Sequence, residues 1–262
     1  AQAIAQWVGA FSYLWIMWLQ RVPLGLQTAS PADLVPTLED LGDFAGAGSA
    51  MLFRQLCNVG AWTFMSSAAT RMGVVTIAAH QVILSMWLVI AFAQDAFGVS
   101  GQVLVARYLG MAADNSVKAA ADATPSALTA RIVAKRVLSL SFLMGVALAT
   151  AGLVVTPLLL PVVCKSAEVQ TLVLQEFPMI LRAFPICCLV WTWDSLFYGA
   201  SDFVYQAKTI AFGSAVGVAG VLASIRLNWG LRGIWTSMIF YYFGLRMIAH
   251  FRRFNSAAGP FG

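Results

Sequence analysis

Long apolar stretches recur along the whole chain, and their length constrains the fold more than any other feature. A transmembrane helix needs about 20 largely apolar residues. Alternation over about ten residues, typical of a membrane barrel, is absent from the sequence. The sequence therefore predicts an all-α integral membrane protein, a polytopic bundle of about seven transmembrane helices. The stretches cover residues 3–20, 48–70, 75–103, 135–156, 173–200, 208–225 and 230–250.

The composition supports this interpretation and disfavours a soluble helical bundle. Hydrophobic residues make up 60% of the chain and charged residues only 10%, whereas soluble domains average about 45–50% and about 25%. Aromatic residues near the ends of several stretches are typical of a membrane interface. The net charge of +5 is explained by Lys and Arg next to the membrane, so we expect a lipid bilayer and no nucleic acid as a partner.

The basic residues are unevenly divided between the two sides of the membrane when successive stretches alternate in direction. Basic residues gather on the cytoplasmic side of membrane proteins. The richer side is therefore predicted to face the cytoplasm, or the stroma in an organelle. It holds Arg21, Arg107, Lys118, Arg131, Lys135, Arg136, Lys208, Arg246, Arg252 and Arg253, and the other side holds Arg71, Lys165, Arg226 and Arg232.

Two polar segments separate the apolar stretches. Residues 21–46 are predicted to form a loop, with a short surface helix from Pro31 capped by Ser30. Residues 110–131 are predicted to form a second loop, because Ala, Asp, Ser and Thr dominate there. The chain opens inside an apolar helix, so we expect a fragment, a processed product or part of a longer chain.

Asp194 lies in the middle of the apolar stretch 173–200. An Asp near the centre of a membrane helix costs about 2.5–3.5 kcal/mol, so such a residue is a functional candidate. Arg182 precedes it by 12 residues, about 18 Å along a helix, and cannot pair with it. Asp194 therefore needs a partner on another helix, a water pocket or a proton. We consider Asp95 as the nearest partner, with one of the two carboxyls protonated, or alternatively a neutral acid bonded to backbone.

Polar residues form a stripe along the stretch 75–103. Ser85, Asp95 and Gln102 follow Gln81 by 4, 14 and 21 residues, which keeps them within about 60° of it on one helix face. Unsatisfied polar groups in lipid cost several kcal/mol. This face should therefore line a cavity, or form a hydrogen-bonded seam between helices.

Further polar residues receive simpler interpretations. Arg54 and Asn58 share one side of the stretch 48–70, and we expect Arg54 to reach back to the membrane interface. His80 begins the striped stretch and is predicted to have a capping or structural role. The four cysteines lack metal-ligand spacing and are predicted to be small buried hydrophobic residues. Because no catalytic motif occurs, we expect no enzyme, no metal and no organic cofactor.

Two runs of residues resemble a known family. Residues 78–84 (AAHQVIL), followed by Gly98, Gln102 and the run 107–110 (RYLG), are similar to a helix of multidrug and toxic compound extrusion (MATE) transporters. Residues 194–202 (DSLFYGASD) resemble the tenth-helix pattern of the same family, in its DinF-like branch with plant and algal plastid members. Residues 3–20 resemble the sixth helix.

The resemblance implies a domain organisation, because a MATE transporter has two lobes of six helices. Residues 1–20 would be the last helix of an N-terminal lobe that this chain lacks. Residues 21–46 would be the linker between lobes, 47–254 a MATE-like six-helix C-terminal lobe, and 255–262 a tail.

The sequence departs from the family pattern at one acidic position. Many members carry a Glu in the seventh helix, in a WxFE pattern, whereas this chain has Met65 at the end of the run 62–65 (WTFM). The DinF-like branch often lacks this acid too. Asp194 is then left as the main acid of the lobe, with Asp95 as a further feature that plastid members share.

The resemblance implies a secondary-active exporter of small organic solutes coupled to H⁺ or Na⁺. Asp194 and Asp95 would handle the coupling cation, and replacing Asp194 with Asn should abolish efflux while leaving folding intact. The cavity-lining residues would be Asn58, Trp62, Gln81, Ser85, Gln102, Trp191 and Phe197.

The alternative is a transporter-derived structural subunit of a larger complex, with no transport of its own. A lobe without its mate exposes a polar face. Either the N-terminal lobe of the same protein or another membrane protein would cover that face. The resemblance points to a plastid membrane, either envelope or thylakoid.

Overall fold

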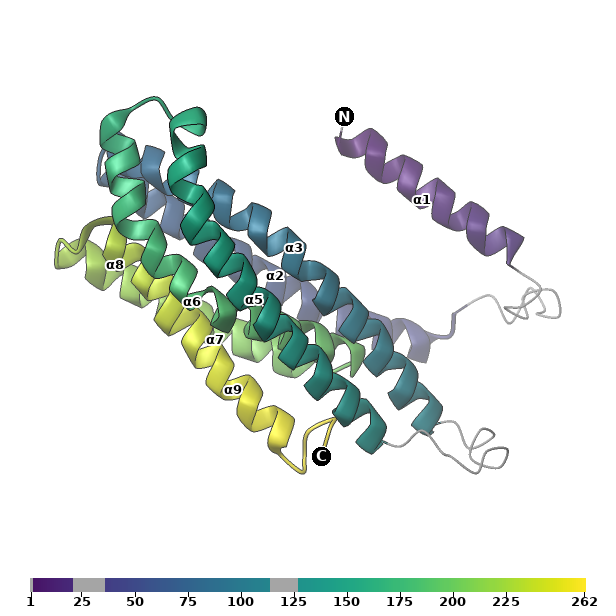
Figure 1. Cartoon of the computed structure of the whole chain (residues 1–262). Helices are drawn as coiled ribbons and strands as arrows, with labels where there is room; N and C mark the ends of the chain where they lie inside the picture. Colours follow the sequence, from purple (N-terminus) through teal and green to yellow (C-terminus); the bar gives the residue numbers. More distant parts are fainter. Residues whose placement is uncertain (1, 21–35, 114–126) are drawn as a thin grey trace. The chain divides into compact units, whose positions relative to one another are not determined.

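A computed structural model describes residues 2–20, 36–113 and 127–262 (Figure 1). These residues form helices and contain no strand, which confirms the all-α prediction. They divide into two compact units, Ala1–Gly48 and Ser49–Gly262, and α2 crosses the boundary. The helices are α1 (Gln2–Leu19), α2 (Leu38–Arg71), α3 (Val74–Ala113), α5 (Ala127–Val163), α6 (Ala167–Gly199), α7 (Phe203–Arg226), α8 (Gly230–Thr236) and α9 (Gly244–Asn255), with a π-helix η1 (Ser237–Phe243) between the last two.

Several helices extend beyond the apolar stretches, so both predicted loops are wrong at their ends. Helix α2 begins at Leu38, within the predicted loop 21–46. A reciprocal capping box explains this start: the amide of Asp40 donates to Thr37 Oγ1 at 3.1 Å, and the amide of Thr37 donates to Asp40 Oδ2 at 2.9 Å. The hydrogen bond from the Thr37 side chain lowers the pKa of the exposed Asp40 carboxyl.

The second predicted loop, 110–131, is shortened from both sides. Helix α3 continues to Ala113 and α5 begins at Ala127, because this segment is rich in Ala, the strongest helix former. The predicted surface helix at Pro31 lies outside the described residues.

Four described helices are long and apolar enough to cross a membrane: Val74–Met111, Leu128–Val163, Ala167–Gly199 and Phe203–Arg226. Ala3–Leu19 is a shorter apolar helix. Polar residues such as Arg54 and Asn58 interrupt the apolar character of α2. The π-helix interrupts the last rod, which ends in the basic residues Arg252 and Arg253.

Helix α6 lies at the centre of the larger unit. It contacts α3, α5, α7 and the continuous rod of α8, η1 and α9, and Figure 1 shows it between these helices. A Cβ at Gly199 would lie 2.4 Å from the backbone oxygen of Gln102. Only glycine therefore allows α3 and α6 to approach so closely at this end.

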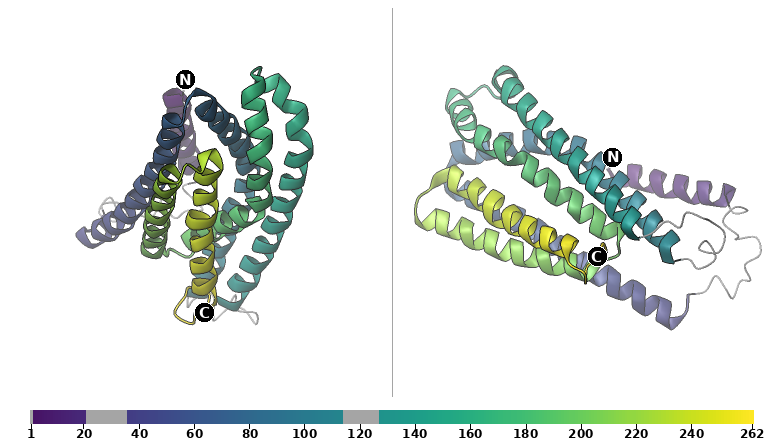
Figure 2. Two further views of the ribbon diagram at one scale, coloured as in Figure 1. Left: turned by 90° about the vertical axis from the view of Figure 1, so that its left-hand side faces the viewer. Right: turned by 60° about the horizontal axis from the view of Figure 1, so that its bottom comes forward.

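The last rod packs along α7 (Figure 2). Two hydroxyls join the helices, Ser224 and Ser237, whose oxygens lie 3.2 Å apart. Gly230 opens the rod with φ +63°, a left-handed conformation that favours glycine. This packing fixes the position of α9 beside α6 and so prepares the site described below.

His80 lies inside a helix and does not cap one, so of the two predicted roles, capping or structural, the structural one holds. It is the seventh residue of α3 and is fully buried. Its Nε2 lies 3.0 Å from the hydroxyl of Ser66, and its ring packs against Trp235 at a centroid distance of 5.6 Å. His80 therefore links α2, α3 and α8 in the core. The cysteines are free thiols, with Cys187 and Cys188 buried and Cys57 and Cys164 half-buried.

Candidate functional site

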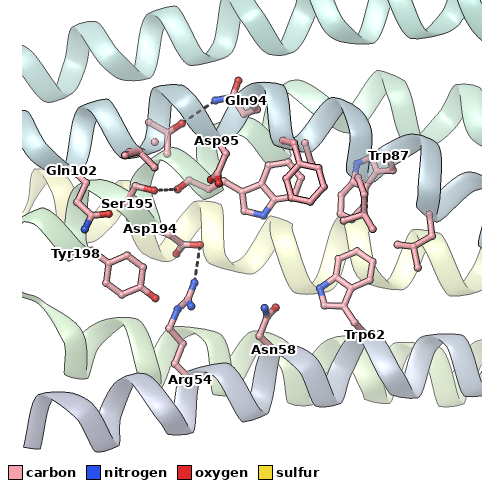
Figure 3. A pocket seen from close by; sticks show the side chains of 18 residues that line it. Arg54, Asn58, Trp62, Trp87, Gln94, Asp95, Gln102, Asp194, Ser195 and Tyr198 are labelled. Carbon is pink, nitrogen blue, oxygen red and sulfur yellow. Dashed lines mark hydrogen bonds and ion pairs between the residues drawn. The ribbon is translucent and has the colours of Figure 1, made fainter. Parts of the chain in front are cut away.

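A pocket of about 550 Å³ opens between α2, α3 and α6 in the larger unit (Figure 3). Its lining divides into two ends. We call one the polar end, formed by Arg54, Asp194, Ser195, Tyr198 and Gln102. We call the other the aromatic end, formed by Trp62, Trp87 and Trp191. Asp95 and Asn58 also line the pocket.

Asp194 is the centre of a buried charge cluster. Its Oδ2 forms an ion pair with Arg246 and lies 3.8 Å from the guanidinium of Arg54. His250 Nε2 lies 3.2 Å from Oδ1, without the alignment of a hydrogen bond. We name Asp194, Arg54, Arg246 and His250 the charge cluster. The carboxylate is thus compensated by side chains from two other helices.

Helix α9 supplies the closest partners of Asp194. Arg246 and His250 are four residues apart and therefore share one helix face. The Arg246 side chain is only 1% exposed, and its guanidinium lies 4.9 Å from the ring centre of Tyr242. Gly213 on α7 leaves room for the aliphatic stem, because a Cβ there would lie 3.1 Å from it.

The interpretation of Arg246 as an interfacial residue is therefore wrong. The count of basic residues on each side of the membrane included it among those that determine orientation. In the structure it is a buried ion-pair partner. Burial of an arginine requires a counter-charge, and Asp194 supplies it.

Arg54 points into the pocket rather than toward the membrane interface, which corrects the sequence expectation. Its guanidinium lies over the ring of Tyr198, 4.8 Å from the centroid, and its Nε is buried without a hydrogen-bond partner. A cation over an aromatic face is held by the negative face of the ring. Arg54 is thus aimed at Asp194 and still has donor capacity.

Asp95 is not the partner of Asp194. Within the part of the chain that the structure describes, no ion pair or hydrogen bond joins these two carboxyls. Asp95 is exposed, lines the pocket, and has no ion-pair partner among the described residues. The two acids therefore have different surroundings, one compensated by charge and one open to the pocket.

Gln94, the neighbour of Asp95, is a buried residue that the sequence analysis missed. Its Nε2 donates to Ser141 at 2.6 Å and to Thr192 at 3.1 Å, and those two hydroxyls lie 2.7 Å apart. This polar triad joins α3, α5 and α6. Part of the polar character of α3 thus forms a seam between helices, while Asp95 and Gln102 line the pocket.

The aromatic end is a cluster of tilted and edge-to-face rings from several helices. The Trp62 and Trp87 centroids are 4.8 Å apart, and Trp87 lies 5.2 Å from Trp191. Trp235 and Phe243 pack edge-to-face against Trp87, at centroid distances of 5.6 Å and 5.9 Å. These distances are typical of favourable aromatic pairs.

The structure brings together some of the predicted cavity residues and not others. Asn58, Trp62, Gln102 and Trp191 line the pocket, and Asn58 also accepts a 2.7 Å hydrogen bond from Tyr242. Three predicted residues do not line it: Gln81 and Ser85 are exposed elsewhere on α3, and Phe197 is buried in a second apolar cluster near the C-terminus.

Arg246, His250 and Tyr198 were also not predicted from the sequence. One signal was available, because Arg246 and His250 lie on one face of the last apolar stretch, as a partner of a buried acid would. Tyr198 had no such signal. Among residues 2–20, 36–113 and 127–262, no group of three or more His, Cys, Asp or Glu could hold a metal ion.

The chain is similar to several curated proteins of Arabidopsis thaliana. It is 30% identical to DETOXIFICATION 45, chloroplastic, over 84% of the chain and 36% of that protein. It is 29% identical to DETOXIFICATION 43 over 86% of the chain and 40% of that protein. DETOXIFICATION 44, also chloroplastic, is 24% identical over 82% of the chain and 38% of that protein.

The chain thus spans well under half the length of the curated relatives it matches. No family model matches it. A solved structure of a MOP superfamily transporter from Pyrococcus furiosus has a similar fold, with a TM-score of 0.69 and 16% identity. That match covers 80% of this chain and 44% of the other.

Proposed function

The chain belongs to the multidrug and toxic compound extrusion family, as its DETOXIFICATION homologues do, and on that basis we propose that it forms one lobe of a secondary-active exporter. The exporter would move small organic solutes across a membrane in exchange for H⁺ or Na⁺. Residues 47–254 would be its C-terminal lobe. The other lobe of such a transporter would cover the open side of the pocket.

The two-ended pocket is the observation that carries this proposal. Ligand pockets are largely apolar, with a few polar groups that orient the ligand. The aromatic end would hold a flat or amphipathic solute, and the polar end would orient it. The pocket volume of about 550 Å³ lies within the range of about 300–1,000 Å³ for such sites.

We assign different roles to the two acids. Asp95 lacks an ion-pair partner among the described residues, so it is the acid that can take up the coupling cation directly. Asp194 is compensated by Arg246, so H⁺ or Na⁺ would have to replace an arginine there. Asp194 would therefore respond only after Asp95 has taken up the cation. Its response would be a weaker ion pair with Arg54.

A specific observation favours a second candidate, a structural membrane subunit without transport. Asp194 already has its counter-charge within the same lobe, and a satisfied ion pair requires no moving cation. In that case the charge cluster would only fix α2 and α9 against α6.

Transport by the full-length protein in proteoliposomes separates the candidates. We expect uptake of fluorescent organic solutes when an H⁺ or Na⁺ gradient is imposed, and a loss of at least about tenfold in Asp95→Asn. Asp202→Asn is the matched control, because this acid pairs with Arg253 outside the pocket. No gradient-driven uptake by the unmodified protein would favour the structural subunit. Normal uptake by Asp95→Asn would remove the role given to Asp95.

The membrane in question is proposed to be a plastid membrane. Two of the similar Arabidopsis proteins are chloroplastic. We expect a fluorescently tagged full-length protein to coincide with chlorophyll at the plastid. Fluorescence at the plasma membrane alone would contradict this location.

A further inference from the structure

A second crevice of about 380 Å³ lies between α7 and α9, apart from the pocket described above. Three basic residues line it, the exposed Lys208 and Arg252 and the buried Arg246, together with polar and apolar side chains. Lys208 lies in the second turn of α7 and Arg252 in the last turn of α9. Both are therefore near the same end of the bundle, where the sequence predicts the cytoplasmic or stromal surface.

The side chains of Lys208 and Arg252 are exposed and have no carboxylate partner among the described residues. The acids nearest in sequence are already used, since Asp202 pairs with Arg253 and Asp194 with Arg246. The mouth of the crevice therefore carries two uncompensated positive charges.

The crevice is apolar one helical turn further in. Phe212 follows Lys208 by four residues and is 62% exposed, and Ile248 precedes Arg252 by four residues and is 53% exposed. Four residues advance a helix by about 6 Å. On both α7 and α9, therefore, the basic residue lies nearer the helix end and the apolar residue lies nearer the centre of the membrane.

We propose that this crevice binds an anionic phospholipid. The phosphate group lies between Lys208 and Arg252, and one acyl chain runs along Phe212 and Ile248. Basic pockets between membrane helices on the cytoplasmic side recognise anionic head groups. The apolar depth favours a lipid over a free phosphate, which would leave Phe212 and Ile248 without a partner.

The proposed lipid site is adjacent to the charge cluster, although it does not depend on transport. Arg246 lines the crevice and is the ion-pair partner of Asp194. A lipid bound along the crevice would therefore lie beside the arginine that pairs with the central carboxylate. The site gives the membrane lipid a direct contact with the element that holds the polar end together.

Thermal unfolding of the full-length protein in a nonionic detergent tests the proposal. Short-chain phosphatidylglycerol is titrated against phosphatidylcholine of the same chain length and against inorganic phosphate. We expect phosphatidylglycerol to raise the midpoint temperature, with little effect of the other two. The double variant Lys208→Gln/Arg252→Gln should weaken the apparent affinity by about 25-fold, or about fivefold for each charge near the membrane.

The matched control is Lys135→Gln/Arg136→Gln, which removes two exposed basic residues of α5 on the same side of the membrane and outside the crevice. It should keep the response to phosphatidylglycerol. An equal loss of the response in the control would overturn the proposal, because any basic residue on this side of the membrane would then attract the anionic lipid equally. Stabilisation by inorganic phosphate alone, or no preference for phosphatidylglycerol, would overturn it as well.

Phe212→Ala should weaken lipid binding with the charges intact, and an unchanged affinity would refute the acyl contact.

Discussion

The two ends of the pocket are held together by different forces. At the polar end, one carboxylate on α6 draws side chains from α2 and α9 toward it. At the aromatic end, tryptophans from α2, α3 and α6 pack ring against ring. Removing one member of a buried ion pair leaves an uncompensated charge, whereas ring packing is a sum of many short contacts. The polar end should therefore be the more sensitive to a single substitution.

The largest effect is expected from Arg246→Gln. It leaves Asp194 buried with only the longer 3.8 Å ion pair to Arg54 and an unaligned His250. This should lower the free energy of unfolding by about 3–5 kcal/mol. The double variant Asp194→Asn/Arg246→Gln should recover much of that loss, because the buried carboxylate is then neutral and only the partly exposed Arg54 keeps a charge. Chemical unfolding in detergent micelles measures both. A double variant no more stable than the single one would show that charge is not the dominant force at this end.

Gly199→Ala should separate α3 from α6 beside the polar end. The new Cβ would lie 2.4 Å from the backbone oxygen of Gln102, and overpacking of this kind costs about 1–3 kcal/mol. The same unfolding measurement applies. Gly60→Ala is the control, because a Cβ there meets no atom within 4 Å. Equal losses in the two variants would contradict the close approach of α3 and α6.

Trp87→Phe tests the aromatic end. A smaller ring keeps most of the contacts to Trp62 and Trp191, and aromatic pairs contribute about 0.5–1.5 kcal/mol beyond burial. We expect a loss of about 1 kcal/mol in unfolding free energy and a weaker response of tryptophan fluorescence to added solutes. A loss as large as that of Arg246→Gln would reverse the comparison.

The smallest effect is expected from Asp202→Asn. Its ion pair with Arg253, 2.8 Å long, lies at the helix ends and is partly exposed. Such pairs contribute at most about 1 kcal/mol and weaken in salt. Unfolding measured at low and high ionic strength should show a small difference that salt removes. A large, salt-independent loss would mean that this pair behaves like the charge cluster.

Much of the fold could be predicted from apolar patterning. The order of the helices and their membrane character follow from long apolar runs with few charges, because lipid admits few alternatives. The ends of helices were less predictable. Residues 38–46 were interpreted as a loop because they carry acids, yet acids also favour the first turn of a helix.

The site was less predictable, because its central contact joins distant residues. Arg246 lies 52 positions after Asp194, and nothing local to Asp194 specifies that partner. The prediction of a polar stripe on α3 assumes the same rotation per residue over 21 residues. Small deviations from that rotation accumulate over such a length. Its later members, Asp95 and Gln102, line the pocket, whereas Gln81 and Ser85 do not.

The π-helix from Ser237 to Phe243 changes the direction in which the residues after it point. Its wider turns hold about one residue more than an α-helix of the same length, so everything after it is rotated by about 100°. The direction in which Arg246 and His250 point is therefore determined by the extra residue in the π-helix as well as by residue type. A chain lacking one residue in this segment would keep both side chains and turn them away from Asp194. The ion pair between Arg246 and Asp194 thus depends on the rotation of α9 about its axis as well as on the two residues themselves.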